Sequence, residues 1–212
     1  VIINKYEKLP PVAMNTFELM RRASSYLKFS PYETIMLAER LYSRGYITYP
    51  RTETTKHPFS FDHKKTLRAL KENTIEGSTI DTINSLLKVS SINPLSGVDR
   101  RDHPPIVPLK NDSALQKNPK LKSLYDLVKL YYLASISSPA IIEERKYVLS
   151  FEGKYFTASS RSIVSKGYLE VFPWDIIGLE RNFPLLVKDQ IVKIDKFLSE
   201  EVKTSPPEHL TE

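Results

Sequence analysis

The hydrophobic pattern changes its period at Pro139, and this change limits the possible fold more than any other feature of the sequence. Before Pro139, apolar side chains recur every three or four residues, which is typical of amphipathic helices. After it, apolar and polar residues alternate, as along strands. The sequence therefore predicts an α+β chain, with a helical region at residues 12–138 and a β-region at 140–198.

Two capping boxes predict where the first helices begin. Asn15-Thr-Phe-Glu18 and Ser30-Pro-Tyr-Glu33 each place a capping side chain three residues before a glutamate, and the second adds proline at the first helical position. We expect a helix at 16–28 and another that ends at Gly45. Such a pair resembles a helix-turn-helix, a geometry that is common but not exclusive to nucleic-acid-binding proteins.

The remaining elements follow from the same signals. We expect helices near 61–72 and 79–89, a loop from 93 to 111, and a longer helix from the Asn118-Pro119 cap to about Ser137. Its buried face should comprise Leu121, Leu124, Leu127, Val128, Tyr131 and Ala134. In the β-region we expect a hairpin with its turn at Glu152-Gly153, and further strands at 162–164 and 191–197.

Composition excludes several classes of protein. The chain has 212 residues and no cysteine, so it cannot hold a disulfide framework, a thiolate zinc finger, an iron–sulfur cluster or a cysteine nucleophile. No apolar run reaches the roughly 18 residues needed to span a membrane. A net charge of +6 suits attraction to nucleic acid but is too mild to demonstrate it. The start at Val1 and the polar end at 205–212 suggest a piece of a longer protein.

The segment Tyr46-Ile-Thr-Tyr-Pro-Arg51 carries the most informative chemistry. Pro50 favours an extended conformation at Tyr49, which places a phenol and the guanidinium of Arg51 on one short segment. A phenol can attack phosphorus, and the planar fork of arginine matches phosphate oxygens. The alternative that Tyr49 merely packs beneath a turn, with Arg51 a solvated charge, stays open on spacing alone because the chain has twelve tyrosines.

The stretch Leu41-Tyr-Ser-Arg-Gly-Tyr-Ile-Thr-Tyr-Pro-Arg-Thr52 resembles the active-site signature of type IA DNA topoisomerases. The continuation to Thr55 is similar to topoisomerase III, and the combined pattern is most similar to its beta type. Asp102-His-Pro-Pro-Ile-Val-Pro108, Phe172-Pro-Trp174 and the segment from Pro206 to Glu212 resemble later landmarks of that family, in the right order.

The resemblance implies a role for five residues. Tyr49 would be the nucleophile that forms a 5′-phosphotyrosine link, and Arg51 would position Tyr49 and the scissile phosphate. His103 would contact the phosphate region, although a loop histidine that satisfies only local hydrogen bonds is the simpler reading of its spacing. Glu53 and Thr204 fall at family positions near bound nucleic acid.

The resemblance also implies the architecture. Residues 1–11 would be a strand entering an all-β arch domain, 12–138 a helical domain that carries the tyrosine, 139–198 the return into the arch, and 199–212 the start of another helical domain. The family's toprim domain, which binds Mg²⁺, would precede this chain, so we assign no metal ligand here. The fragment alone would then be inactive.

The resemblance implies single-stranded DNA as substrate, with RNA as a second candidate, the toprim domain of the same full-length chain as partner, and an accessory protein or helicase as a further one. It implies a nuclear location, with the cytoplasm as an alternative, and no membrane. Two other classes of protein fit the sequence less well. The first is a non-enzymatic helix-turn-helix protein that binds nucleic acid, but the second predicted helix of this chain lacks the Asn-, Arg- or Gln-rich face that would read bases. A tyrosine recombinase or type IB enzyme would carry its tyrosine late in the sequence.

Overall fold

A computed structural model describes residues 1–72, 74, 77–111, 113–176, 178–180, 183–196, 198–204 and 206. Within these residues, five α-helices precede a long β-hairpin, which confirms the predicted α+β class and the change of period near Pro139. The helices are α1 (Thr16–Arg22), α2 (Pro31–Ser43), α3 (His63–Lys71), α4 (Gly77–Lys88) and α5 (Pro119–Ser135). The strands are β1 (Ile2–Lys8), β2 (Ala140–Phe151) and β3 (Lys154–Ser165).

The predicted caps begin α1, α2 and α5. The side chains of Asn15, Ser30 and Asn118 each accept a hydrogen bond from the backbone N–H three residues later. The first helix continues beyond Arg22 as a π-helical turn, η1 (Ala23–Leu27), and ends at Lys28 in the left-handed conformation. The expected helix at 16–28 is therefore correct in extent but changes its hydrogen-bonding pattern halfway.

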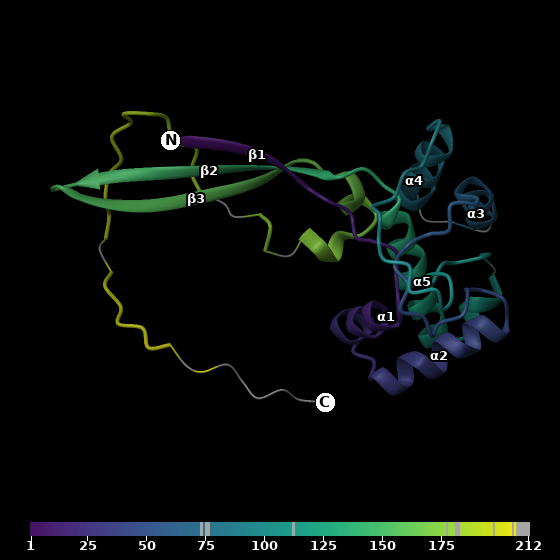
Figure 1. The fold of residues 1–212 in the computed structure, drawn as a ribbon. Coiled ribbons are helices and arrows are strands. Elements are labelled where there is room, and N and C mark those ends of the chain that lie inside the picture. Colours follow the sequence, from purple (N-terminus) through teal and green to yellow (C-terminus); the bar gives the residue numbers. More distant parts are fainter. Residues whose placement is uncertain are drawn as a thin grey trace.

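Helix α5 lies at the centre of the helical body, in contact with α2, η1 and α4 (Figure 1). All six residues predicted for its buried face are buried. Tyr125, Tyr132 and Leu133 are buried as well, because neighbouring elements cover this helix on more than one side. A helix that is buried on nearly all sides carries apolar residues all round, so its sequence shows only a weak amphipathic pattern.

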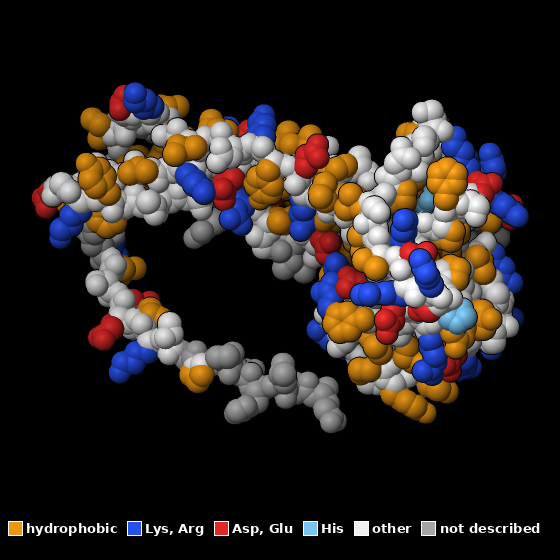
Figure 2. Space-filling model, viewed as in Figure 1, with side chains coloured by type: hydrophobic (Ala, Val, Ile, Leu, Met, Phe, Trp, Pro, Cys, Tyr) orange, Lys and Arg blue, Asp and Glu red, His pale blue; other side chains and the backbone are white. Residues whose placement is uncertain are grey.

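The three strands form one antiparallel sheet in the order β1-β2-β3. The predicted hairpin turn is present, since Glu152 and Gly153 both have positive φ between β2 and β3. The strand expected at 162–164 is the end of β3. Figure 1 shows the sheet projecting from the helical body as an arm, and Figure 2 shows hydrophobic side chains along this arm.

The strand predicted at 191–197 is wrong: residues 191–196 have no regular secondary structure, and Phe197 lies outside the described residues. Side chains of residues 186–192 line a groove together with residues 147–151 of the hairpin, and within the described ranges no strand pairing joins the two stretches. In the following segment, residues 198–204 and 206 also have no helix, and the rest of the expected helical start lies outside the described residues.

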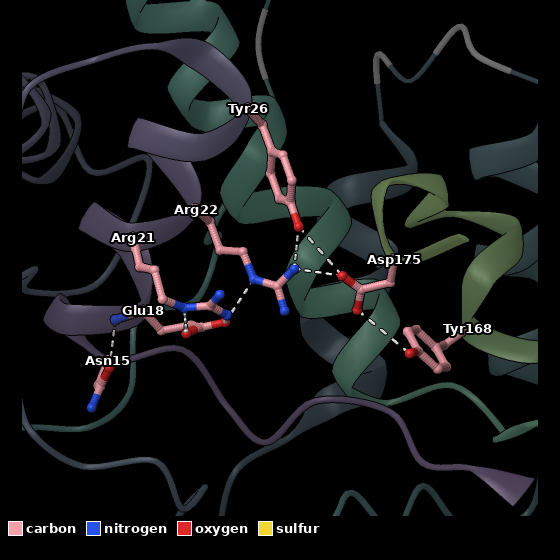
Figure 3. A network of polar contacts seen from close by, with 7 residues as sticks. All are labelled: Asn15, Glu18, Arg21, Arg22, Tyr26, Tyr168 and Asp175. Atoms are coloured by element: carbon pink, nitrogen blue, oxygen red, sulfur yellow. Dashed lines mark hydrogen bonds and ion pairs between the residues drawn. The ribbon is translucent and has the colours of Figure 1, made fainter. Parts of the chain in front are cut away.

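A cluster of charged and aromatic side chains joins α1 to the chain that returns from the hairpin. This return contains two short 3₁₀ helices, η3 (Gly167–Glu170) and η4 (Pro173–Ile176). Arg22 bonds Glu18 on its own helix at 2.7 Å and Asp175 of η4 at 2.5 Å, as Figure 3 shows. Burial alone would lower the pKa of Arg22, but its hydrogen bonds with the two carboxylates raise it overall.

Aromatic rings enclose the same arginine. The guanidinium carbon of Arg22 lies 5.3 Å from the ring centroid of Phe172 and 5.5 Å from that of Tyr26. Trp174 stacks on Tyr26, with centroids 5.2 Å apart and rings 15° from parallel. The segment Phe172-Pro-Trp174 thus fixes the base of the arm against the helical body.

Candidate active site

The segment that carries Tyr49 is held on one side by the chain at 105–109. Ile47 forms an isolated antiparallel bridge with Pro108, and the N–H of Thr48 donates to the carbonyl of Val107 at 3.0 Å. The hydroxyl of Thr48 donates to the carbonyl of Pro105 at 2.8 Å. Ile47 and Val107 are both buried. This pairing explains the β-type sequence of the segment and fixes the backbone directly before Tyr49.

The other side of Tyr49 is held by the first residue of α1. The Thr16 hydroxyl donates to the carbonyl of Pro50 at 2.7 Å, and the N–H of Thr52 donates to that hydroxyl at 2.7 Å. The N–H of Thr16 also donates to the carbonyl of Thr52 at 3.0 Å. Tyr49 therefore sits between two anchored stretches of backbone.

The Tyr49 ring lies between two other rings at the surface. Its centroid is 4.6 Å from that of His103 and 5.2 Å from that of Tyr42, and both contacts are edge-to-face. Tyr49 is half-buried, and His103 is exposed. The structure thus brings together two residues that the sequence analysis placed in one site. Tyr42, in the last turn of α2, is 46% exposed even though its ring contacts Tyr49.

Arg51 is anchored by a carboxylate of α2. Its Nε and Nη2 both donate to Oε1 of Glu39, at 2.9 and 2.6 Å. The Arg51 side chain is 57% exposed. The hydrogen bonds to Glu39 raise the pKa of Arg51, and the charge of Glu39 and the nearby phenol of Tyr49 contribute further. The guanidinium therefore stays charged close to the phenol and remains accessible to a ligand.

Asp102 fastens the loop of His103 to the segment after Tyr49. Its carboxylate accepts hydrogen bonds from the Thr54 hydroxyl at 2.5 Å and from the N–H of Glu53 at 2.7 Å. These bonds hold the pKa of Asp102 well below its usual range. The Thr52 hydroxyl donates to the carbonyl of His103 at 2.7 Å. The side chains of Thr52 and Thr54 point to the same side because residues alternate along an extended chain.

The other two predicted site residues differ in position. Glu53 is exposed and follows Arg51 at the site, where its backbone carbonyl accepts a hydrogen bond from Asn15 and its N–H donates to Asp102. Thr204 is exposed and lies in the irregular tail, which Figure 1 draws apart from the helical body. The structure therefore does not bring Thr204 to Tyr49.

Sequence reasoning missed Glu39 and Asp102 as parts of this site. Glu39 stands three residues before Tyr42, so a helix at this position puts both on one face, toward the chain that follows Gly45. Asp102 directly precedes the predicted site histidine, and the alternating threonines at 52 and 54 were the signal for a carboxylate that accepts from both. Neither pairing could be deduced without the tertiary contact.

A surface pocket of about 410 Å³ adjoins the site. It is lined by residues 54–59 and by residues around His103, including Lys56, His57, Arg101 and Asp102. His57 packs edge-to-face against His63, and burial lowers the pKa of His57 to about 4. The pocket thus places cationic and aromatic side chains next to the Tyr49 ring pair.

The acidic and histidine side chains that the structure describes do not gather into a metal centre. Among the residues that the structure describes, no group of three or more His, Cys, Asp or Glu side chains is arranged to hold a metal ion. Glu143 and Glu144, two adjacent carboxylates of β2, are ion-paired within the sheet to Lys5 and Arg161 respectively. The carboxylates and histidines within the described ranges therefore do not fit a Mg²⁺ site. Also within the described residues, no helix is long and apolar enough to cross a membrane.

Comparison with known proteins assigns the class. The chain matches the protein family described as DNA topoisomerase over residues 2–212, and it belongs to this family. Within the family it falls in the type IA class, and its similarity is to the beta type of topoisomerase III. DNA topoisomerase 3-beta-1 of Homo sapiens is 34% identical over 205 residues, which cover 97% of this chain and 23% of that protein.

A second relative and a solved structure support the same class. DNA topoisomerase 3-beta of Arabidopsis thaliana is 35% identical over 202 residues, which cover 95% of this chain and 23% of that protein. The crystal structure of full-length topoisomerase I from Thermotoga maritima superposes with a TM-score of 0.64 at 26% identity, and the match covers 87% of this chain and 30% of that one. The chain thus spans about a quarter of the length of the curated relatives.

Proposed function

We propose that this chain carries the nucleophile of a type IA topoisomerase. The Oη of Tyr49 attacks the scissile phosphorus, a P–O bond forms to the phenol, and the bond to the 3′ oxygen breaks. The phenol gives up its proton and the departing 3′ oxygen takes one up, so one end leaves with a 3′-hydroxyl and the other stays attached as a 5′-phosphotyrosine. A phenol with a pKa near about 10 is a good leaving group, so the same hydroxyl can reseal the strand without ATP.

The contact of the Tyr49 ring with His103, together with the charged Arg51 two residues further along the chain, is the observation that supports this proposal. Arg51 donates to the phosphate oxygens as charge redistributes on phosphorus. His103, which touches the Tyr49 ring, contacts the phosphate region and supports the active conformation. Glu53, exposed just beyond Arg51, lies along the bound strand. Thr204 would reach nucleic acid only where the tail lies beside the strand in the complete protein.

We propose the domain arrangement that the family resemblance implies. Residues 1–11 and 139–198 belong to an all-β arch, 12–138 form the inserted helical domain of helix-turn-helix type, and 199–212 begin a further helical domain. Support comes from the antiparallel pairing of β1 with β2, because the two crossings between arm and helical body lie side by side. The residues described here do not fit a Mg²⁺ site, so we assign Mg²⁺ to a toprim domain elsewhere in the full-length chain.

We propose that the substrate is single-stranded DNA. The enzyme cuts one strand, passes another strand through the break and reseals the cut. RNA is the second candidate, and no residue of this site distinguishes the two sugars. The beta-type relatives are eukaryotic, which supports a nuclear location before a cytoplasmic one. An accessory protein or helicase is a further candidate partner. The relatives are named topoisomerases, and the non-enzymatic binder has no comparable support.

The test is a covalent adduct. The complete gene product that carries this chain is mixed with labelled single-stranded DNA and magnesium, then denatured, and the label that stays on the protein is measured. We expect an adduct with the wild-type protein and none with Tyr49→Phe, which keeps the ring contacts and removes the nucleophilic oxygen. Tyr32→Phe, at an exposed tyrosine at the start of α2, is the matched control. A wild-type protein without an adduct, or a Tyr49→Phe protein with one, refutes the assignment.

A further inference from the structure

Helix α2 lies against both proposed catalytic side chains through one of its faces. Glu39 and Tyr42 are three residues apart on this helix and therefore project from the same side. Glu39 contacts Arg51, and Tyr42 contacts Tyr49. The two residues that would carry out the chemistry are thus both placed by the last turns of the preceding helix.

The geometry of the Glu39 contact leaves part of Arg51 available. The hydrogen bonds run from Nε and Nη2 to a single oxygen, Oε1, so one edge of the guanidinium is used. Within the part of the chain that the structure describes, Nη1 of Arg51 makes no hydrogen bond. An arginine can offer a second pair of N–H groups to phosphate while the first is occupied, because its five donors form a rigid planar fork.

The contact with Glu39 also limits the conformations of the Arg51 side chain. The Arg51 side chain is long and 57% exposed, so it would sample many rotamers without a partner. Ion pairs this exposed contribute little to stability. Fixing the direction of a charged donor matters more for catalysis, because a preorganised donor needs no rearrangement as the transition state forms.

We propose that Glu39 is a positioning residue for the cleavage reaction, which holds Arg51 so that its free donors face the phosphate attacked by Tyr49. This inference rests on the proposed function. The opposite role is that Glu39 competes with phosphate for Arg51 and restrains the enzyme. The two roles predict opposite effects when Glu39 is removed.

The experiment measures single-turnover cleavage of a labelled single-stranded oligonucleotide by the complete gene product. We expect Glu39→Ala to slow adduct formation about tenfold, less than the roughly 10²-fold or greater loss expected for Arg51→Ala. Glu39→Gln keeps an acceptor oxygen and should recover part of the rate. Glu33→Ala is the matched control, since it removes a glutamate of the same helix whose ion pair is with Lys120, away from Arg51. Faster cleavage by Glu39→Ala would overturn the proposal.

A double-mutant cycle separates positioning from general loss of structure. If Glu39 acts through Arg51, Glu39→Ala should have no further effect on a protein that already carries Arg51→Ala. An equal tenfold loss in both backgrounds would show that Glu39 acts elsewhere and would end the proposal. Oligonucleotide affinity, measured by anisotropy in the Tyr49→Phe background, should change less than the cleavage rate.

One readout does not depend on activity. In the 212-residue chain, the Nε–Hε signal of Arg51 can be assigned by its loss in Arg51→Lys. We expect it to be resolved and protected from exchange, to lose that protection in Glu39→Ala, and to keep it in Glu33→Ala. An unchanged signal in Glu39→Ala would refute the anchoring. If this signal behaves as expected but no adduct forms with Tyr49 intact, the proposed function fails and the contact is only structural.

Discussion

At the scale of single residues, Asp102 links the two loops of the candidate site. We expect Asp102→Asn to slow adduct formation, because the amide loses the charge that strengthens the bonds from Thr54 and Glu53 and turns one acceptor into a donor. The cleavage rate should fall about tenfold or more, while the far-UV circular dichroism stays that of the parent. Asp99→Asn, at an exposed aspartate in the same loop, is the control.

His57 should make stability depend on pH. Burial holds its pKa at about 4 in the folded chain, against an ordinary value of 6.5. As pH falls, His57 therefore takes up its proton in the unfolded chain before it does so in the folded chain. The free energy of unfolding should decrease as pH drops from about 6.5 to about 4. Below about pH 4, His57 should cause no further change in the free energy of unfolding. The loss attributable to His57 is at most about 3.5 kcal/mol.

Urea unfolding at a series of pH values checks this. His57→Phe keeps an aromatic ring beside Phe61 and His63 but removes the titrating group. Its stability should change less steeply over the same pH range, with a residual slope from His63, whose pKa burial also lowers. A slope as steep as that of the parent would contradict the assignment to His57.

At the scale of elements, α1 and η4 are joined through Arg22. The Arg22 side chain is 10% exposed and that of Asp175 is 15% exposed, so removal of the guanidinium leaves a carboxylate poorly compensated. We expect Arg22→Ala to lower the free energy of unfolding by about 3–5 kcal/mol.

Arg21 provides a control one residue away. It pairs with the same Glu18, but its side chain is 48% exposed. Arg21→Ala should therefore cost about 1 kcal/mol or less in denaturant unfolding of the same chain. Equal losses for the two variants would show that the link to η4 contributes nothing beyond an ordinary surface ion pair.

At the scale of the whole molecule, the sheet leaves the helical body as an arm, and the chain crosses between them at β1 and β2. We propose that movement at these crossings opens the gate for strand passage. Labels at Lys154→Cys near the hairpin turn and Ser43→Cys at the end of α2 should change their separation during the reaction of the complete protein. Both positions are exposed.

A second pair of labels, at Ser43→Cys and Gln116→Cys, lies within the helical body and should keep its separation. A distance between arm and body that stays constant throughout turnover would rule out gating at these crossings. This chain contributes no cysteine of its own, so within it the labels go only where they are placed.

The sequence by itself determined where most elements begin, because capping asparagines and serines, prolines and the change of hydrophobic period act over a few neighbouring residues. It also indicated Tyr49, Arg51 and His103 through a resemblance between short motifs. The strand predicted at 191–197 shows the limit of such signals: alternation creates two faces, but a strand also needs a partner for its backbone groups.

Only the tertiary structure decided which distant residues meet. It placed Glu39 on Arg51, Asp102 on Thr54 and His103 on Tyr49, and it left Thr204 in the tail. It also buried Arg22, which periodicity alone assigns to no partner. These pairings depend on how α2, the Tyr49 segment and the loop at 93–111 pack together. Such contacts are set by the fold as a whole, and no local pattern in the sequence encodes them.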